Sequence, residues 1–185
     1  MWRLSVAKLR RIKTHLRSGG VIAYATESCF GLGCDPQNSR AVRKLLRIKR
    51  RPKHKGLIVI GDRKERFTGL IRPISAQDLA RVAATWPGPH TWLIPVAENV
   101  KKLLTGYSSV LAVRATAHSD ARNLCMRLNT ALVSTSANRA GERPLKTTRD
   151  CLRRFGRNVM VIGGRIGQRK NPSAIQDLRS GRIFR

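Results

Sequence analysis

The densest chemical feature of the sequence is a run of basic residues from Arg43 to Lys55 that contains no acidic residue. Its members are Arg43, Lys44, Arg47, Lys49, Arg50, Arg51, Lys53 and Lys55. A solvated helix face is the ordinary explanation of such a run, but this one continues past Pro52 onto a predicted turn, where α/β proteins place ligands. Guanidinium and ammonium groups bind phosphate oxygens. The positions of Lys49 and Arg51 therefore indicate a pair that binds a triphosphate.

Small polar residues after a predicted strand form a second candidate site, Ser134-Thr135-Ser136-Ala137-Asn138. Hydroxyl and amide groups at the end of a buried strand offer donors and acceptors without bulk. The same residue types are equally typical of a turn in which Ser and Asn side chains cap the local backbone, and the spacing alone leaves both explanations open. A third candidate edge follows the first predicted strand, where Thr26 and Glu27 stand.

Several common catalytic arrangements are missing from the sequence. Gly31 and Gly33 lack the third glycine of a dinucleotide-binding fingerprint, and no GxxxxGK[ST] loop occurs, so any ATP site must work without a Walker motif. The histidines and cysteines are His15, His54, His90, His118, Cys29, Cys34, Cys125 and Cys151. The histidines show no motif spacing to carboxylates and the cysteines form no CxxC pair, so we expect no zinc and no metal ligands. Buried, reduced thiols are typical of cytoplasmic proteins.

The charge is the strongest compositional signal, because 38 Lys and Arg residues stand against 10 Asp and Glu residues among 185, a formal net charge of +28. Such a chain indicates polyanionic partners, namely nucleic acid, nucleotides or acidic membrane surfaces. A generally basic proteome is the alternative explanation. Hydrophobic residues make up 41% of the chain, which favours a folded core over disorder. No apolar run approaches the length of a signal core or a membrane span, so we expect no membrane partner.

Hydrophobic periodicity predicts the elements that position these groups. Helices are expected from Ser5 to Gly19-Gly20, from Asn38 or Ser39 to before Pro52, from Ser75, over 119–128 and over 148–155. Strands are expected over 21–24, 57–60, 91–96, 110–113, 131–134 and 159–162, with extended segments at 173–178 and 182–184 and a polar turn over 26–35. The alternation predicts an α/β domain over 1–185, without linkers, that has a single, mostly buried mixed sheet flanked by helices.

Six ordered segments resemble the motifs of the YrdC-like family. They are VIAYATESCFGLGCD at 21–35, KRRPKHKGLI at 49–58, WPGPHT at 86–91, LAVR at 111–114, STSAN at 134–138 and NPSAI at 171–175. Their order and spacing over nearly the whole chain are far more specific than any single motif. The length, without an additional C-terminal domain, resembles the single-domain bacterial form. Ala25 departs from the usual proline of the family, and the looser turn is expected to weaken threonine binding at most.

The resemblance implies a twisted α/β domain around a large, basic, concave cleft. It implies the activity of an L-threonylcarbamoyladenylate synthase, a nucleotidyltransferase. In that activity threonine and bicarbonate form an N-carboxylated threonine, its carboxylate attacks the α-phosphorus of ATP, and pyrophosphate leaves. Other, threonylcarbamoyl-transferring proteins then use the threonylcarbamoyl-AMP to modify an adenosine beside the tRNA anticodon. The expected substrates are ATP, L-threonine and bicarbonate, with magnesium carried by ATP and not held in a protein cage.

The resemblance also implies roles for individual residues. The expected catalytic quartet around ATP is Lys49, Arg51, Ser136 and Asn138. Further nucleotide contacts are expected from Thr91, the backbone of Val113, Ser134 and Arg185. Threonine is expected to contact Thr26, Lys55, Arg114 and Ser173, with Arg114 as the fork for its carboxylate. Catalysis would depend on positioning and on positive charge that offsets the charge developing on pyrophosphate, without a protein nucleophile.

The alternative function is a non-catalytic protein that binds double-stranded or structured RNA in the same basic cleft. Neutralisation of phosphates favours it, whereas the scarcity of aromatic residues, 5% of the chain, and the lack of an RNP motif oppose it. Transfer RNA or other RNA also suits a basic synthase as a partner. RNA affinity that survives Lys49→Ala combined with Arg51→Ala would place RNA binding outside the ATP site.

Overall fold

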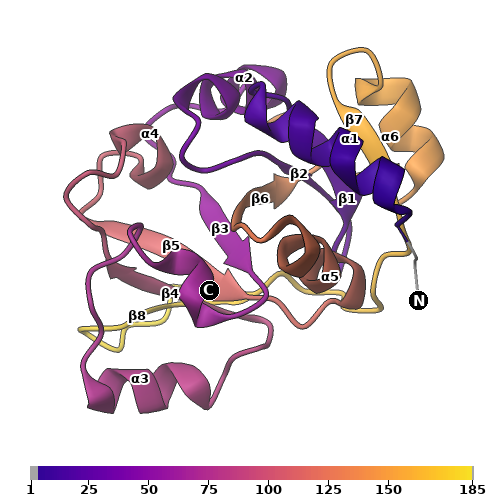
Figure 1. The fold of residues 1–185 in the computed structure, drawn as a ribbon. Coiled ribbons are helices and arrows are strands. Elements are labelled where there is room, and N and C mark those ends of the chain that lie inside the picture. The colour runs from indigo at the N-terminus through magenta and orange to yellow at the C-terminus, as the bar shows by residue number, and fades with distance from the viewer. Residues whose placement is uncertain (1–3, 185) are drawn as a thin grey trace.

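One eight-stranded mixed sheet forms the centre of the protein, whose residues 4–184 are described by a computed structural model (Figure 1). The strands are β1 (Ile22–Ala25), β2 (Phe30–Gly33), β3 (Ile58–Gly61), β4 (His90–Pro95), β5 (Val110–Ala115), β6 (Leu132–Ser136), β7 (Met160–Gly163) and β8 (Ala174–Asp177). They lie in the order β7-β1-β2-β6-β3-β5-β4-β8. β1 and β7, β3 and β5, and β4 and β8 pair in parallel, and the other neighbours pair antiparallel. The predicted single mixed sheet is confirmed.

Most of the helices begin where the sequence places polar capping residues. They are α1 (Val6–Arg17), α2 (Ser39–Lys49), α3 (Ala76–Ala83), α4 (Lys102–Thr105), α5 (Ser119–Leu128) and α6 (Thr148–Phe155), with a 3₁₀ helix at Lys64–Phe67. The side-chain oxygens of Ser5, Asn38 and Ser75 each accept a hydrogen bond from a backbone N–H of the first turn. Such caps satisfy donors that a helix start leaves unpaired. The predicted starts of α1, α2 and α3 are therefore confirmed.

Helices cover both faces of the sheet, because alternating strand residues point to opposite sides. Buried residues of α1 and α5 share a cluster with Ile22, Tyr24, Ile60 and Leu132. Buried residues of α2, α3, α4 and α6 share the other cluster with neighbours of those strand residues, including Ala23, Val59 and Val133. Two aliphatic layers thus hold the sheet from both faces.

The expected turn over 26–35 is wrong in its middle, where Phe30–Gly33 forms β2. A Cβ on Gly33 would lie 2.6 Å from the carbonyl oxygen of Val133. Glycine lets β2 lie this close to β6, but glycine-rich sequence is typical of turns. The helix α4 and the 3₁₀ helix, which the sequence did not predict, have 4 residues each. Elements this short show no periodic pattern.

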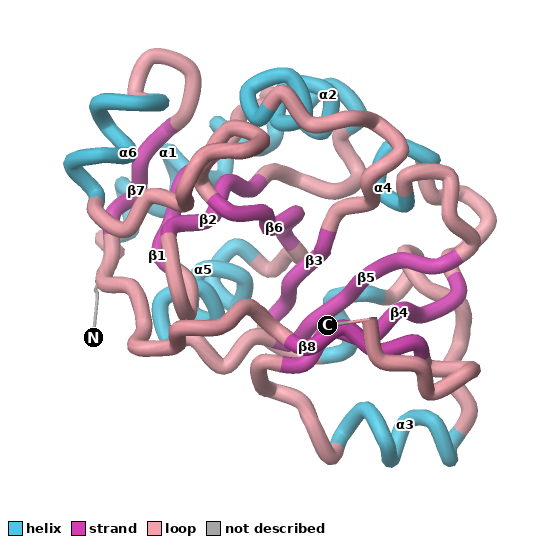
Figure 2. The backbone as a smooth tube through the Cα atoms, turned by 180° about the vertical axis from the view of Figure 1, so that it is seen from behind, coloured by secondary structure: helices cyan, strands magenta, loops and turns pink. Residues whose placement is uncertain are grey.

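A segment that we call the strap, residues 164–173, joins β7 at one edge of the sheet to β8 at the other. Figure 1 shows this crossing in the last part of the chain, and Figure 2 shows the same crossing from behind. Because the strap connects the two outermost strands, it must pass over the strands between them.

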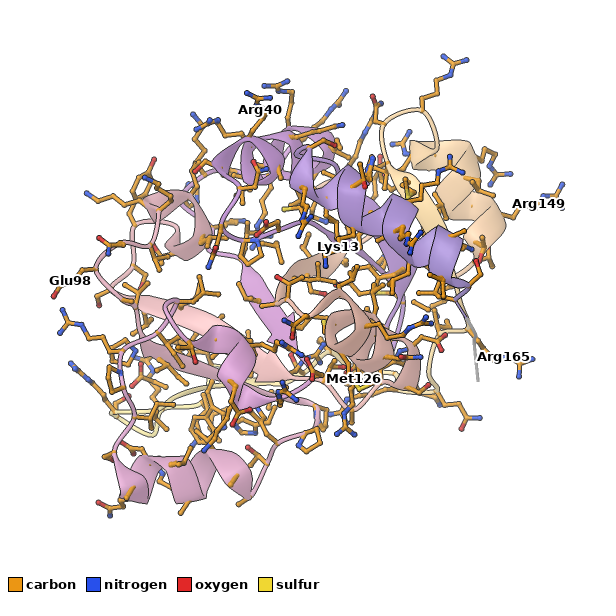
Figure 3. All side chains as sticks on the ribbon, in the orientation of Figure 1. Lys13, Arg40, Glu98, Met126, Arg149 and Arg165 are labelled. Carbon is orange, nitrogen blue, oxygen red and sulfur yellow. The ribbon has the colours of Figure 1, made fainter. Side chains whose placement is uncertain are left out.

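The outer surfaces of α1 and α2 are strongly basic. Exposed cations on these two helices are Lys8, Arg10, Arg11, Lys13, Arg17, Arg40, Arg43 and Arg47. The side chains of Lys13 and Arg40 are labelled among the surface cations in Figure 3. Within residues 4–184, no helix combines the length and the apolar character needed to cross a membrane.

Candidate functional site

A cavity of about 250 Å³ opens over the central strands of the sheet. Its lining comprises Thr26, Glu27, Ser28, Cys29, Gly31, Arg51, Gly56, Leu57, Ile58, Arg114, Ser134, Thr135, Ser136, Arg169, Asn171, Pro172 and Ser173. Register pairs Ile58 with Ser134, and Ile60 with Arg114, so these side chains share one face of the sheet. The expected candidate edges of β1 and β6 therefore meet at one site.

Gly31 on β2 leaves space at the floor of the cavity because it has no side chain. A Cβ at this position would lie 3.1 Å from Cγ2 of Thr26 and 3.4 Å from Oγ of Ser134. Any larger side chain would fill space between two lining residues. The glycine pair that is a weak motif in the sequence thus has a steric role in the fold.

Lys49 lies at the end of α2 with 3% of its surface exposed. Its ammonium donates to the carbonyl oxygen of Ser136, to the carbonyl oxygen of Asn138 at 2.8 Å, and to Oδ1 of Asn138 at 3.2 Å. Burial, with a contribution from the charge of Arg51, lowers the pKa of Lys49 to about 8. At neutral pH the ammonium therefore keeps its three protons, which bind the end of β6 and the loop that follows it.

The loop after β6 is fixed by its own side chains as well. Ser136 Oγ donates to Oδ1 of Asn138 at 2.5 Å. The side-chain amide nitrogen of Asn138, Nδ2, donates to the carbonyl oxygens of Arg139 at 2.9 Å and Glu142 at 2.7 Å. Asn138 thus orders the loop, while Ser134 and Ser136 face the cavity.

Arg51 reaches the cavity from the turn between α2 and β3. The helix ends at Arg50, whose φ of 52° is left-handed. The Arg51 guanidinium then donates to the carbonyl oxygens of Gly56 at 2.8 Å and Lys55 at 3.3 Å. These bonds hold a half-buried positive charge against the cavity wall.

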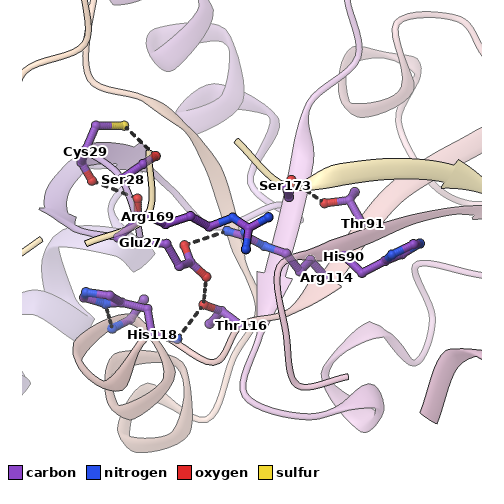
Figure 4. A network of polar contacts seen from close by, with 12 residues as sticks. Glu27, Ser28, Cys29, His90, Thr91, Arg114, Thr116, His118, Arg169 and Ser173 are labelled. Carbon is purple, nitrogen blue, oxygen red and sulfur yellow. Dashed lines mark hydrogen bonds and ion pairs between the residues drawn. The ribbon is translucent and has the colours of Figure 1, made fainter. Parts of the chain in front are cut away.

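At the other end of the cavity, Glu27 joins Arg114 to Thr116 (Figure 4). Arg114 Nη2 donates to Oε2 of Glu27 at 3.1 Å, and Thr116 Oγ1 donates to Oε1 at 2.7 Å. Burial alone would raise the pKa of Glu27, but the charge of Arg114 and the bond from Thr116 outweigh it, so the pKa lies below its ordinary value. Within residues 4–184, Nε of Arg114 is buried and has no hydrogen-bond partner.

The strap closes one side of the cavity. The backbone N–H groups of Gly167 and Arg169 donate to the carbonyl oxygens of Thr26 at 3.0 Å and Glu27 at 3.2 Å. Further along, Oγ of Ser173 lies 2.9 Å from Oγ1 of Thr91, which is fully buried. Thr91 therefore stands behind Ser173 and supports it.

The cavity brings together six of the residues expected from the sequence, which are Thr26, Arg51, Arg114, Ser134, Ser136 and Ser173. The described lining does not include Lys49, Asn138 and Thr91, which support residues that do line it. Val113 has its side chain in the core of the sheet, and Lys55 is exposed. Arg185 lies outside the described residues.

Sequence reasoning missed Arg169, Thr116 and Cys29. Arg169 stands two residues before the NPSAI segment, and Thr116 stands two residues after LAVR, so a wider window around each motif contains both residues. Burial raises the pKa of the Cys29 thiol, which keeps it protonated and unreactive at neutral pH. Cys29 therefore suits a wall of the cavity and not a nucleophile.

The donor set of the cavity suits an anionic ligand better than a resident cation. Its lining holds three guanidinium groups, from Arg51, Arg114 and Arg169, and one carboxylate, that of Glu27. Across the described residues, no group of three or more His, Cys, Asp or Glu side chains could hold a metal ion.

Known proteins are similar to this chain in sequence and in fold. The Sua5, YciO and YrdC family model, whose description reads "Telomere recombination", matches residues 14–185. The threonylcarbamoyl-AMP synthase of Chromobacterium violaceum is 53% identical over 176 residues, which cover 95% of this chain and 91% of that protein. The threonylcarbamoyl-AMP synthase of Methylobacillus flagellatus is 53% identical over 178 residues, which cover 96% of this chain and 99% of that protein.

Two solved structures are similar as well. Sua5 of P. abyssi, in complex with L-threonine, matches with a TM-score of 0.86 and 27% identity over 95% of this chain, which spans only 52% of that protein. YciO of E. coli shares the fold, with a TM-score of 0.82 and 20% identity over 99% of this chain and 90% of that one. The chain therefore belongs to the Sua5/YciO/YrdC family.

Proposed function

We propose that the protein is an L-threonylcarbamoyladenylate synthase, a nucleotidyltransferase that forms threonylcarbamoyl-AMP and pyrophosphate from ATP, L-threonine and bicarbonate. The observation that carries this proposal is one cavity lined by guanidinium and hydroxyl groups in a chain whose curated relatives are threonylcarbamoyl-AMP synthases. In the proposed reaction, threonine and bicarbonate condense with loss of water to a carbamate. The carbamate oxygen then forms a bond to the α-phosphorus of ATP, and the bond to pyrophosphate breaks.

The nucleotide occupies the end of the cavity formed by Arg51 and the loop after β6 in this proposal. Arg51 offsets the charge that develops as pyrophosphate leaves, since a fixed positive charge stabilises a transition state most where charge accumulates. The Ser134 hydroxyl, which lines the cavity, donates to a phosphate or ribose oxygen, while Ser136 Oγ, whose proton goes to Asn138, accepts from a ribose hydroxyl. Lys49 and Asn138 act mainly by holding that loop in place, because their polar groups are bonded to it.

Threonine occupies the end of the cavity near Arg114. The guanidinium binds its carboxylate, and the hydroxyls of Thr26 and Ser173 lie at the same end for its polar side chain. Positioning of the amine next to bicarbonate, and of the carbamate next to ATP, supplies the catalytic effect. Lys55, Thr91, Val113 and Arg185 are further proposed contacts, of which the first three lie behind or beside the cavity lining.

Magnesium is proposed to arrive bound to the triphosphate. Glu27, the carboxylate of the described lining, is already held by Arg114 and Thr116. Magnesium prefers oxygen ligands and commonly bridges phosphates, so the triphosphate supplies the ligands that the cavity lacks.

RNA is a proposed additional partner, through the basic surface of α1 and α2. Asn38 at the start of α2 donates to the carbonyl oxygen of Arg17 at the end of α1, at 3.3 Å, so the two basic helices lie next to each other at these ends. Arginine-rich surfaces bind phosphates with a strong dependence on salt. A variant with Lys13→Ala, Arg17→Ala and Arg43→Ala is expected to weaken tRNA binding while pyrophosphate release persists; unchanged RNA affinity would contradict this surface.

The product is proposed to pass to threonylcarbamoyl-transferring proteins that act on tRNA. The protein is proposed to work in the cytoplasm. Four free cysteines, of which Cys34, Cys125 and Cys151 are buried, support a reducing compartment.

The deciding experiment is pyrophosphate release from ATP, with the nucleotide product identified by its mass. Release should require both threonine and bicarbonate and should yield threonylcarbamoyl-AMP. Lys49→Ala should slow release at least about a hundredfold. Replacement of Lys53, an exposed cation of the same basic run, by alanine should leave release unchanged. Absence of release from a folded wild-type chain that binds ATP would overturn the synthase and favour the RNA-binding alternative.

A further inference from the structure

Glu27 is bound within the protein through both of its side-chain oxygens. Its side chain is 15% exposed, and its two oxygens accept hydrogen bonds from Arg114 and Thr116. Thr116 follows directly after β5 and is fully buried, so its hydroxyl fixes the carboxylate from the interior of the protein. Glu27 therefore has a fixed orientation in the protein before any substrate binds.

Arg114, unlike Glu27, has a polar atom without a hydrogen-bond partner among the described residues. Its side chain is 10% exposed, its Nη2 is bound to Glu27, and in the described part of the chain its buried Nε finds no acceptor. A buried N–H without a partner is unfavourable, and an arginine side chain has many rotamers. Something must keep the guanidinium in this orientation against both tendencies, and the carboxylate of Glu27 is the group in contact with it.

We propose that Glu27 is a positioning residue for the amino-acid substrate, which acts through Arg114 by holding the guanidinium at the cavity wall with donors left for a second carboxylate. The inference rests on the proposed function, because it takes the amino-acid carboxylate as the second partner of Arg114. A guanidinium fork can serve two carboxylates, since it carries five N–H donors in one plane.

A role as the base that deprotonates the threonine amine is the competing explanation for a carboxylate in this cavity. The contacts of Glu27 oppose it, because both oxygens already accept bonds, one from a cation, and such contacts weaken a carboxylate as a proton acceptor. The two roles differ in kinetics. A positioning residue changes the KM for threonine, whereas a base changes kcat and its dependence on pH.

The test compares Glu27→Gln with the wild type in the pyrophosphate assay and in calorimetric titration with L-threonine. The amide keeps the size of the side chain and loses its charge. We expect the KM and the Kd for threonine to rise about tenfold, with kcat, its pH profile and the KM for ATP within about twofold of the wild type. Glu27→Asp, which restores the charge at shorter reach, should recover part of the affinity.

Asp62→Asn is the matched control. Asp62 accepts from Nε of Arg66 at 2.6 Å, and the two side chains are 6% and 9% exposed, but neither lines the cavity. This variant should leave the KM for threonine unchanged. If Glu27→Gln does not fold, Thr116→Val loosens Glu27 without removing it and should raise the KM for threonine about threefold.

Unchanged threonine affinity in Glu27→Gln, or in Thr116→Val where the first variant is unfolded, would overturn the inference. A fall in kcat with loss of the acidic limb of the pH profile would overturn it in favour of a base. If the wild type binds threonine but releases no pyrophosphate, the synthase proposal fails, and the calorimetric effect of Glu27→Gln still decides the role of Glu27. If the wild type binds no threonine, both proposals fall.

Discussion

Lys49 and Arg114 are two buried cations, with 3% and 8% of their surfaces exposed, of which Lys49 lies behind the cavity lining and Arg114 is part of it. They differ in how their donors are used. The three protons of Lys49 all go to oxygens of Ser136, at the end of β6, and Asn138, in the loop after it. Arg114, in contrast, has one described bond, to Glu27, and an Nε without a partner in residues 4–184. Burial and charge alone would give the two residues the same role. The count of used donors separates a cation that holds the protein from one that is available to hold a ligand.

Lys49→Ala is the strongest way to test the first half of this comparison. It leaves the carbonyl oxygens of Ser136 and Asn138 without their donor, so the loop should lose its geometry. We expect kcat/KM for ATP to fall at least about a hundredfold, a loss typical for a preorganised donor at an active site. The free energy of unfolding, measured by urea denaturation, should fall by about 2 kcal/mol.

Lys53→Ala, in the same basic run but exposed, is the control for that loss. A variant Lys49→Ala that loses activity while its stability is unchanged would show that Lys49 contacts the nucleotide directly and would remove the contrast with Arg114.

Arg114→Lys tests the second half of the comparison, which is that Arg114 is available to hold a ligand. Lysine keeps a positive charge beside Glu27 but lacks the planar fork that binds a carboxylate through two bonds. The KM for threonine should rise about tenfold to a hundredfold, which corresponds to about 1.4–2.8 kcal/mol, while the KM for ATP stays close to that of the wild type. Steady-state kinetics with each substrate varied in turn checks this. A larger effect on ATP than on threonine would place the nucleotide at this end of the cavity.

A pH series sharpens the comparison through stability. The pKa of Lys49 in the folded protein is about 8, below its ordinary value of 10.5. Between pH 8 and pH 10.5 the unfolded chain binds one proton more than the folded protein, so the free energy of unfolding rises with pH. Below pH 8 Lys49 is protonated in both states, and its contribution to the free energy of unfolding is constant and least favourable. Urea denaturation from pH 7.5 to 10.5 should show this rise for the wild type relative to Lys49→Met, at about 1.4 kcal/mol per unit of pKa difference. Parallel pH profiles for the two proteins would contradict the lowered pKa.

The smallest expected effect concerns the hydrogen bond between the neutral hydroxyls of Thr91 and Ser173. Thr91→Val keeps the shape of the side chain but removes the hydroxyl 2.9 Å from Ser173. A single neutral hydrogen bond contributes about 0.5–1.5 kcal/mol, so the KM for threonine should rise about threefold, well below the effect of Arg114→Lys. An effect as large as that of Arg114→Lys would mean that Thr91 itself contacts a substrate.

The sequence predicted the sheet and the helix starts because these depend on local patterns. Buried aliphatic runs predicted most of the strands, and Ser5, Asn38 and Ser75 marked the starts of three helices. It could not predict β2, because glycine is typical of both turns and close backbone approach, and only the neighbouring strand decides between them.

For the site, the sequence predicted which segments meet but not how their donors are used. Lys49 and Arg51 are two residues apart and of similar charge, yet the first binds the loop after β6 and the second lines the cavity. The partners of Lys49 lie 87 and 89 positions away. Contacts over such separations depend on tertiary packing, so no window of sequence contains them.

The two backbone hydrogen bonds between the strap and the turn after β1 make the amide protons of Gly167 and Arg169 natural reporters of what happens in the cavity. Their acceptors are the carbonyl oxygens of Thr26 and Glu27, two residues proposed to meet or to position threonine. Exchange of these protons with deuterated solvent requires the strap to separate from that turn. Binding of threonine in the cavity should therefore slow deuterium uptake in the strap, although the strap lies far from β1 in the sequence.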